Sequence, residues 1–240
     1  MRTLSVLATL SILGLAGCAP AAAPTPSPTA APTPTDAPTV STAPASTPRT
    51  TFIARTPHDG ALGMTVTLPA SGWRWDDIAR GFLKGGEVKS VPEAAVMLWS
   101  WPAGTGFYVF GDPCHWASTK PDNPATTADE IVAGLAAQAS RGASEPADVS
   151  IGGYAGKSIT LHVPDDAVFD GCDSSEFASY GVTDDELARY HQGPGQIDDF
   201  WVVEVDGAIA IIDATYRPDT PAELVEEMHA IADSITFDAP

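Results

Sequence analysis

The chain has 240 residues and a formal net charge of −19 at pH 7, from 31 Asp and Glu against 12 Lys and Arg. Nucleic acids and anionic lipid surfaces are bound through clustered Lys and Arg, so no nucleic-acid partner is expected. The excess of carboxylates could attract cations or basic partners, although a solvated surface is the commoner reason for such a charge.

Residues 1–17 have the pattern of a signal peptide. Arg2 precedes an apolar run from Leu4 to Leu15, which is shorter than the roughly 20 residues of a membrane-spanning helix. The sequence Leu15-Ala16-Gly17-Cys18 resembles the lipobox of bacterial lipoproteins. This resemblance implies that Cys18 is lipidated, becomes the first residue of the mature chain and anchors it to the extracytoplasmic side of the cell membrane. The alternative is an ordinary secretory peptide with an unrelated cysteine.

Residues 18–51 predict a disordered tether that begins at the lipidated cysteine. From Ala19 onward the segment consists almost entirely of Ala, Pro, Thr and Ser, so it has no side chains with which to build a core. Dense proline favours extended polyproline II, in which roughly 30 residues at about 3.1 Å each reach about 90 Å. Such segments also resemble O-glycosylated stalks.

Residues 52–240 predict a single globular α+β domain, with a largely antiparallel sheet and helices packed on it. Gly152-Gly153 indicates a turn between two strands. Strands are expected where β-branched and aromatic residues cluster, at Met64–Leu68, Val96–Trp101, Phe107–Phe110, Val149–Ile151, Ser158–Val163 and Ile235–Phe237.

Capping residues predict three helices. The first begins at Thr127, has Glu130 in the capping-box position and stops at Arg141-Gly142. A shorter helix is expected to begin at Thr183, run through Leu187 and Tyr190, and end at Gly193-Pro194. The third begins at Thr220, with proline in the first helical position and apolar residues repeating along one face.

Asp206-Gly207 predicts a tight hairpin between Phe200–Val205 and Ala208–Tyr216. This pair of residues tolerates the positive φ angles of a two-residue turn. The second strand begins with apolar residues that do not alternate with polar ones, so both of its faces should be covered. We therefore expect it in the centre of the sheet.

Cys114 and Cys172 remain once Cys18 carries lipid, and an even number of cysteines in an oxidising compartment predicts a disulfide. Closing a loop of about 58 residues stabilises the fold by roughly 4 kcal/mol. The rival hypothesis is a catalytic thiol at Cys114 beside His115. Residues adjacent in sequence seldom place an imidazole correctly against a thiol, and export disfavours a free reactive cysteine.

Asp170, Asp173 and Glu176 are a weak candidate for a cation site, because they lie in a segment crowded with carboxylates. The run resembles part of a calcium loop, but Val168 and Phe177 stand where ligands are required. The five histidines show no metal-ligand spacing, and GxSxG, Walker A and GxGxxG motifs are absent from the sequence. We expect no metal, no cofactor and no enzyme activity.

Five of the six tryptophans lie close together in the sequence. Trp73 and Trp75 are two residues apart, as are Trp99 and Trp101, so within strands each pair would share one face. Together with Trp116 they form either part of the core, which is the commoner case, or an aromatic wall that contacts an apolar or sugar ligand.

Several motifs in the domain resemble uncharacterised secreted or lipid-anchored domains of actinobacteria over about residues 60–237. They are Asp112-Pro113-Cys114-His115-Trp116, Gly152-Gly153-Tyr154-Ala155-Gly156-Lys157, Cys172-Asp173, Gly193-Pro194-Gly195-Gln196, Trp201-Val202-Val203-Glu204-Val205-Asp206-Gly207 and Asp213-Ala214-Thr215-Tyr216. The order of hairpin, helix and final strand is similar to the PsbP and LpqN type of α/β/α sandwich. These families imply no shared catalytic residue and no cofactor, and their adaptor and assembly members favour binding.

We therefore expect a membrane-anchored extracytoplasmic lipoprotein that acts as a non-catalytic binding or sensing module. The Trp-rich half and the Cys114–Cys172 loops would contact an envelope protein or a small-molecule ligand. One alternative is a cell-envelope hydrolase, which needs a cleft where a nucleophile lies within hydrogen-bond reach of a histidine or paired carboxylates. Another is a purely structural envelope protein, which burial of the tryptophans would favour.

Overall fold

An antiparallel sheet of seven strands lies at the centre of the part of the chain that the structure describes. The computed structural model describes residues 50–55, 62–69, 72–85, 93–138, 140–182 and 187–238, within a compact unit that spans Ala45–Pro240. Cys18 and tether residues 18–49 lie outside this description. The strand order is β3-β4-β5-β12-β11-β8-β7, with bounds β3 Arg74–Asp76, β4 Gly81–Lys84, β5 Ala94–Trp101, β7 Ala147–Ile151, β8 Tyr154–His162, β11 Ile197–Val205 and β12 Ala208–Tyr216.

The predicted hairpin forms the middle of this sheet. β11 and β12 pair from Ile197 with Tyr216 to Val205 with Ala208, and the turn places Asp206 at φ 51° and Gly207 at φ 87°. β12 is the fourth of the seven strands and is buried along almost its whole length. The expectation from its unbroken apolar run is therefore confirmed. The Gly152-Gly153 turn is confirmed as well, between β7 and β8.

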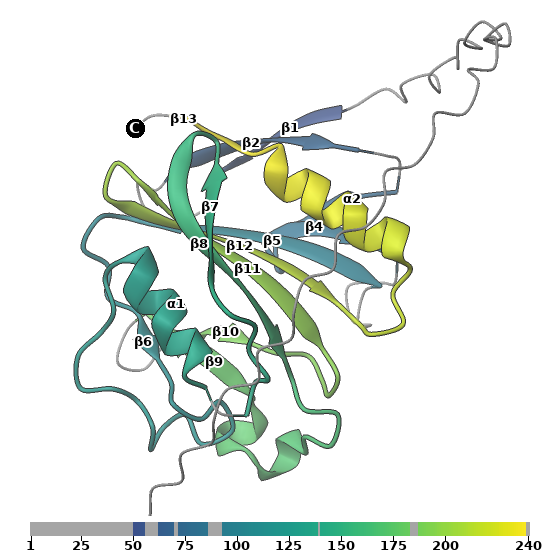
Figure 1. The fold of residues 1–240 in the computed structure, drawn as a ribbon. Coiled ribbons are helices and arrows are strands. Elements are labelled where there is room, and N and C mark those ends of the chain that lie inside the picture. Colours follow the sequence, from purple (N-terminus) through teal and green to yellow (C-terminus); the bar gives the residue numbers. More distant parts are fainter. Residues whose placement is uncertain are drawn as a thin grey trace, which may run out of the picture. The chain divides into compact units, whose positions relative to one another are not determined.

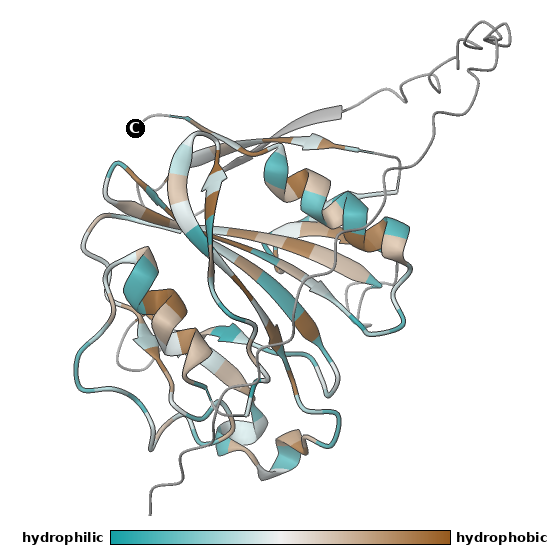
Figure 2. Ribbon diagram, in the orientation of Figure 1, coloured by the Kyte–Doolittle hydropathy of each residue, from teal (hydrophilic) through white to brown (hydrophobic). Residues whose placement is uncertain are grey.

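The two helices cover opposite faces of the central sheet, as Figure 1 shows. α2 (Ala222–Asp233) packs its apolar side on one face, together with strand β2 (Gly63–Leu68). α1 (Ala128–Ala136) packs on the other face. Both helices carry hydrophobic and hydrophilic residues in turn (Figure 2), which fits elements with one side on the core and one side in solvent.

Two small antiparallel sheets complete these layers. β2 lies between β1 (Thr50–Arg55) and β13 (Thr236–Asp238), so the first two residues of β1 belong to the segment expected to be tether. On the α1 face, β9 (Ala178–Gly181) lies between β10 (Leu187–Tyr190) and β6 (Tyr108–Val109). The expected α+β fold with a largely antiparallel sheet and a disulfide is confirmed.

The first helix begins as predicted. The Thr127 side chain accepts a hydrogen bond from the Glu130 amide, while the Glu130 carboxylate accepts from the Thr127 amide, which completes the capping box. Glu204 in β11 accepts from the Ala128 amide at 2.8 Å, so the sheet satisfies another free N–H group of the first turn. The helix ends at Ala136, earlier than expected, and the chain then turns inward to bury Arg141.

Two helix predictions need correction. The helix expected from Thr183 to Gly193-Pro194 is wrong from Leu187 onward, because Leu187–Tyr190 forms strand β10. Pairing with β9 and burial of Arg189 outweigh the local capping signal there. Residues 183–186 lie outside the described part. α2 begins at Ala222, and Thr220 accepts from the Arg217 amide in the preceding turn. Neither α1 nor α2 has the length and apolar composition needed to cross a lipid bilayer.

Candidate functional site

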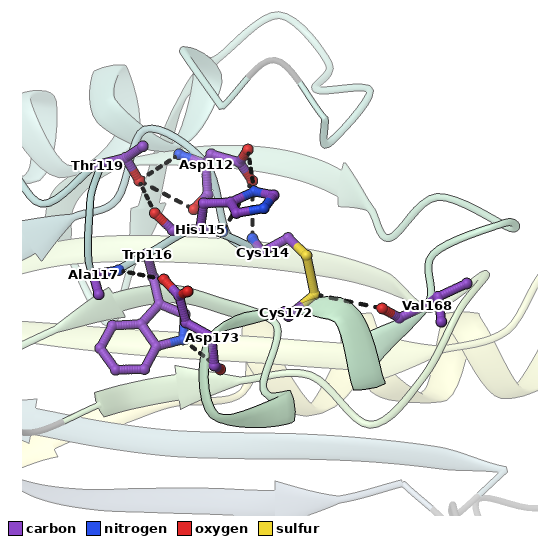
Figure 3. The surroundings of a disulfide bond; sticks show 9 residues. All are labelled: Asp112, Cys114, His115, Trp116, Ala117, Thr119, Val168, Cys172 and Asp173. Carbon is purple, nitrogen blue, oxygen red and sulfur yellow. Dashed lines mark hydrogen bonds and ion pairs between the residues drawn. A yellow bond between two sulfur atoms is a disulfide. The ribbon is translucent and has the colours of Figure 1, made fainter.

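A disulfide joins Cys114 to Cys172, as the sequence predicts, with 4.5 Å between their Cα atoms. The Cys114 carbonyl oxygen accepts from the Asp173 amide at 2.9 Å, and the Pro113 carbonyl oxygen accepts from the Ala178 amide at 2.9 Å. One covalent bond and two backbone hydrogen bonds therefore hold together two loops that lie far apart in the sequence. Figure 3 shows this region, which we call the disulfide loops, residues 111–119 and 164–177.

Side chains of the disulfide loops form further hydrogen bonds, both within the first loop and between the two loops. Asp112 accepts from the Cys114 amide at 2.9 Å and lies 3.1 Å from Nδ1 of His115. The Trp116 indole N–H donates to the Asp173 carbonyl oxygen at 3.1 Å, and the Asp173 carboxylate accepts from a neighbouring amide. His115 thus faces Asp112 while Cys114 is oxidised, so the geometry fits a structural disulfide and not a thiol paired with an imidazole (Figure 3).

Phe177 links the disulfide loops to the interior. Its ring stacks on Phe169 with 5.5 Å between centroids and meets the His191 ring edge-on at 5.8 Å. The Arg141 guanidinium lies over the same ring, 5.8 Å from its centroid. The loops therefore rest directly on polar side chains that are buried beneath them.

These buried side chains form a network of opposite charges on the α1 face of the sheet. Arg141 donates to Asp198 at 2.7 Å, and Arg189 donates to Asp198 at 2.7 Å and to Asp213 at 2.5 Å. All four are buried, and His191 lies within 3.1 Å of Asp198. Charges removed from water are tolerated when each has an oppositely charged, hydrogen-bonded partner, as here.

Burial sets the protonation of this network. Burial opposes the charge on Asp198, but contacts with His191, Arg189 and Arg141 outweigh it and hold the pKa of Asp198 well below its usual value. Burial, with the Asp198 charge, raises the pKa of Asp213 to about 7. Burial and the Arg141 charge lower the pKa of His191 to about 3, so the imidazole is neutral at physiological pH.

Ser179, His191 and Asp198 follow one another in the hydrogen-bond order of a serine hydrolase triad. Ser179 Oγ lies 2.8 Å from Nε2 of His191, and Nδ1 lies 3.1 Å from Asp198. The arrangement is closed, because Ser179 is fully buried and Arg141 donates to both Ser179 Oγ and His191 Nε2 at 2.7 Å. A guanidinium in the acceptor position of the imidazole blocks the proton transfer that activates a serine.

The three candidate cation-site residues lie in two short helices and at the end of the second, with Asp173 in Asp173–Ser175 and Glu176 directly after it. Asp173 is engaged with Ala117, and Asp170 belongs to the short helix Phe169–Gly171. Among the described residues, no group of three His, Cys, Asp or Glu side chains is placed to hold a metal ion.

The five candidate tryptophans do not form one surface. Trp73 and Trp75 pack with the core on the α2 face, whereas Trp99 and Trp101 are buried together on the α1 face. Trp73 donates from its indole to Glu227 at 2.8 Å, and Trp116 belongs to the disulfide loops. Trp73 and Trp75 share one face of the sheet and Trp99 and Trp101 share the other, so the sheet separates the two pairs. Ligand contact by these residues stays a prediction.

Sequence reasoning missed the buried network altogether. Asp198 and Asp213 interrupt strands that are otherwise apolar, and a carboxylate inside a strand covered on both faces requires a cation nearby. The position of these two carboxylates in the sequence therefore indicates a buried ionic contact. Arg141 and Arg189 come from separate segments, a turn after α1 and strand β10, and no spacing in the sequence brings either one to these carboxylates.

No protein-family model matches this chain, and no curated protein matches it in sequence. The solved structures that are similar over most of its length include the following two. LpqN of Mycobacterium tuberculosis, described as involved in cell envelope biogenesis, has 13% identity and a TM-score of 0.38 and covers 80% of this chain and 91% of its own. The PsbP protein CyanoP of Synechocystis sp. PCC 6803 has 13% identity and a TM-score of 0.34, covering 73% of this chain and 86% of its own.

LpqN and PsbP are the two proteins whose type the order of hairpin, helix and final strand resembles. At such TM-scores the likeness is distant and carries no information about function. The resemblance to an actinobacterial family of secreted domains stays a prediction.

Proposed function

We propose that this chain is an exported, lipid-anchored protein of the cell envelope whose disulfide-bonded domain is a non-catalytic binding or sensing module. The observation that carries the proposal is Leu15-Ala16-Gly17-Cys18 directly after a short apolar run. The Cys114–Cys172 disulfide supports it, because disulfides persist in oxidising compartments outside the cytoplasm. In this proposal the domain lies on the extracytoplasmic side of the cell membrane, at the end of a Pro-rich tether.

The surroundings of Ser179 support a domain without catalytic activity. Its hydroxyl is enclosed by Arg141, His191 and Gln138, so a substrate cannot reach it in this conformation. The neutral, weakly basic His191 is a poor acceptor for the serine proton. The network is better suited to hold β9 and β10 on the sheet and so to give the disulfide loops a rigid base.

Fractionation of cells that express the full chain tests the anchor. Wild-type protein is expected in the membrane fraction, exposed to protease added to intact cells from which the outer layers have been removed. Cys18→Ala is expected to be released or retained as an uncleaved precursor, and Cys172→Ser, the matched control, to stay in the membrane. A wild-type chain in the cytosol, or a Cys18→Ala chain that is cleaved after Gly17 and still anchored, would contradict the proposal.

A cell-envelope hydrolase is the second candidate, favoured by the Ser179–His191–Asp198 order. A fluorophosphonate probe labels an activated serine, so the full chain should react at Ser179 if this candidate holds, and Ser179→Ala should not react. We expect no labelling of the folded wild type. Labelling at Ser179 without unfolding would replace the binding proposal by this one.

A further inference from the structure

Asp199 is held by side chains from three other elements on the α2 face of the central sheet. Thr160 in β8 donates to Oδ1 at 2.5 Å, and Tyr216 in β12 donates to Oδ2 at 3.0 Å. Nε2 of His229 in α2 lies 2.8 Å from the same Oδ2. The carboxylate is thereby fixed, and 11% of its side chain is exposed.

His229 is the member of this group that opens to solvent, with 45% of its side chain exposed. Its ring meets Trp201 edge-on, with 5.4 Å between centroids. An ionised carboxylate accepts hydrogen bonds, so Nε2 carries the proton that it shares with Asp199. Nδ1 of the neutral ring is then a hydrogen-bond acceptor, in a position fixed by both Asp199 and Trp201.

The other histidines in the described part of the chain provide a contrast. His191 is enclosed in the buried network. His115 pairs with Asp112, but 42% of the Asp112 side chain is exposed, so solvent surrounds this pair. His162 lies exposed on β8. Among these, His229 combines a carboxylate that is almost buried with a ring that solvent reaches.

Two negative charges act on His229, those of Asp199 and Asp233. The hydrogen bond to Asp199, and the charges of Asp199 and Asp233, raise the pKa of His229 above its usual value. Asp199 comes from β11 and Asp233 from α2, β8 contributes uncharged Thr160, and burial with Asp199 keeps Tyr216 in β12 neutral by raising its pKa. The Asp199 carboxylate, 2.8 Å from Nε2 of the ring, and the charge of Asp233 make this site electronegative, so it attracts cations and repels anions.

We propose that the Asp199–His229 pair is a contact site for a protonated amine, which donates an N–H to Nδ1 of neutral His229. The proposal rests on the binding function proposed above and gives that function a ligand chemistry. An imidazolium has no acceptor and repels a cation, so the amine and the proton compete for Nδ1. The amine belongs either to a lysine side chain of a protein partner or to a small molecule.

A titration of the full chain followed through its histidine ring signals by NMR tests this competition. A ligand that binds the neutral ring lowers its pKa, by about one unit at a concentration of roughly ten times Kd. We expect butylammonium chloride to lower the pKa of His229 relative to sodium chloride at equal ionic strength, and to leave His162 unchanged. A larger effect of a peptide with one lysine would assign the amine to a protein side chain, and an equal effect to a free amine.

Two variants separate a local site from bulk charge. Asp199→Asn should abolish the effect of butylammonium on His229, whereas Asp219→Asn, which removes one exposed carboxylate elsewhere, should preserve it. An unchanged His229 pKa with butylammonium, a rise with sodium acetate, or equal effects of the two variants would overturn the amine site. Such results would leave the anchored module intact, because fractionation of Cys18→Ala tests it separately.

Discussion

Arg141 and Asp198 form an ion pair in which neither side chain has any exposed surface, with Nη2 of Arg141 donating to Oδ2 of Asp198 at 2.7 Å. The two residues are 57 positions apart in the chain. Removal of one partner leaves the other charge buried and unpaired, which is the costly case for an ion pair. The pair is therefore a sensitive probe of the buried network.

Arg141→Met should lower the free energy of unfolding by about 3–5 kcal/mol, because Asp198 loses one of its two guanidinium partners. Urea denaturation measures the change. Lys157→Met is the matched control, since Lys157 pairs with the exposed Asp148 and should change stability far less. Equal losses in the two variants would mean that burial does not determine the strength of these pairs.

The disulfide should contribute about 4 kcal/mol, the value expected when a crosslink with a sequence separation of 58 restricts the unfolded chain. Cys114→Ser with Cys172→Ser should lower the urea midpoint accordingly, and reduction of the wild type should have a similar effect. Cys18→Ser should leave the domain as stable as before. A double variant with wild-type stability would contradict a structural role for the bridge.

The raised pKa of Asp213 predicts a dependence of stability on pH. Its folded-state pKa of about 7 lies above the value in the unfolded chain, so the folded state binds more protons between pH 4 and pH 7. This contribution is complete below the unfolded pKa and is lost as pH rises through about 7. Relative to Asp213→Asn, the wild type should lose roughly 2 kcal/mol between pH 5 and pH 7. If urea denaturation shows that the free energies of unfolding of the two proteins change equally between pH 5 and pH 7, the raised pKa of Asp213 is refuted.

Thr127→Ala should destabilise the domain by about 1 kcal/mol, because the capping box at the start of α1 loses its side-chain acceptor. Thermal unfolding followed by circular dichroism measures the difference. Thr127→Ser keeps the hydroxyl and should retain most of the stability. If serine and alanine have the same effect, the loss comes from packing of the threonine methyl group and not from the cap.

Local patterns in the sequence predict several elements because the forces that form them act between near neighbours. The Asp206-Gly207 turn, the Thr127 capping box and the central position of β12 follow from backbone geometry and from apolar residues along one strand. The region of Leu187–Tyr190 differs, because its capping signal is overridden by pairing with β9 and by the contacts of Arg189.

The buried polar sites depend on contacts that no local pattern encodes. Asp198 and Asp199 are neighbours in β11 and point to opposite faces of the sheet, one to Arg141 and Arg189, the other to His229. Alternation along a strand predicts that opposition. These three partners come from three separate segments, so only the assembled fold identifies them.

The mass of the N-terminal peptide from the membrane-bound protein tests the central claim, that the chain is lipidated at Cys18 and exported. We predict a peptide that begins at Cys18 and carries the mass of a diacylglyceryl group, in a chain whose Cys114 and Cys172 resist alkylation until they are reduced. A peptide that begins at Met1, with an unmodified Cys18 thiol in soluble protein, would contradict the account.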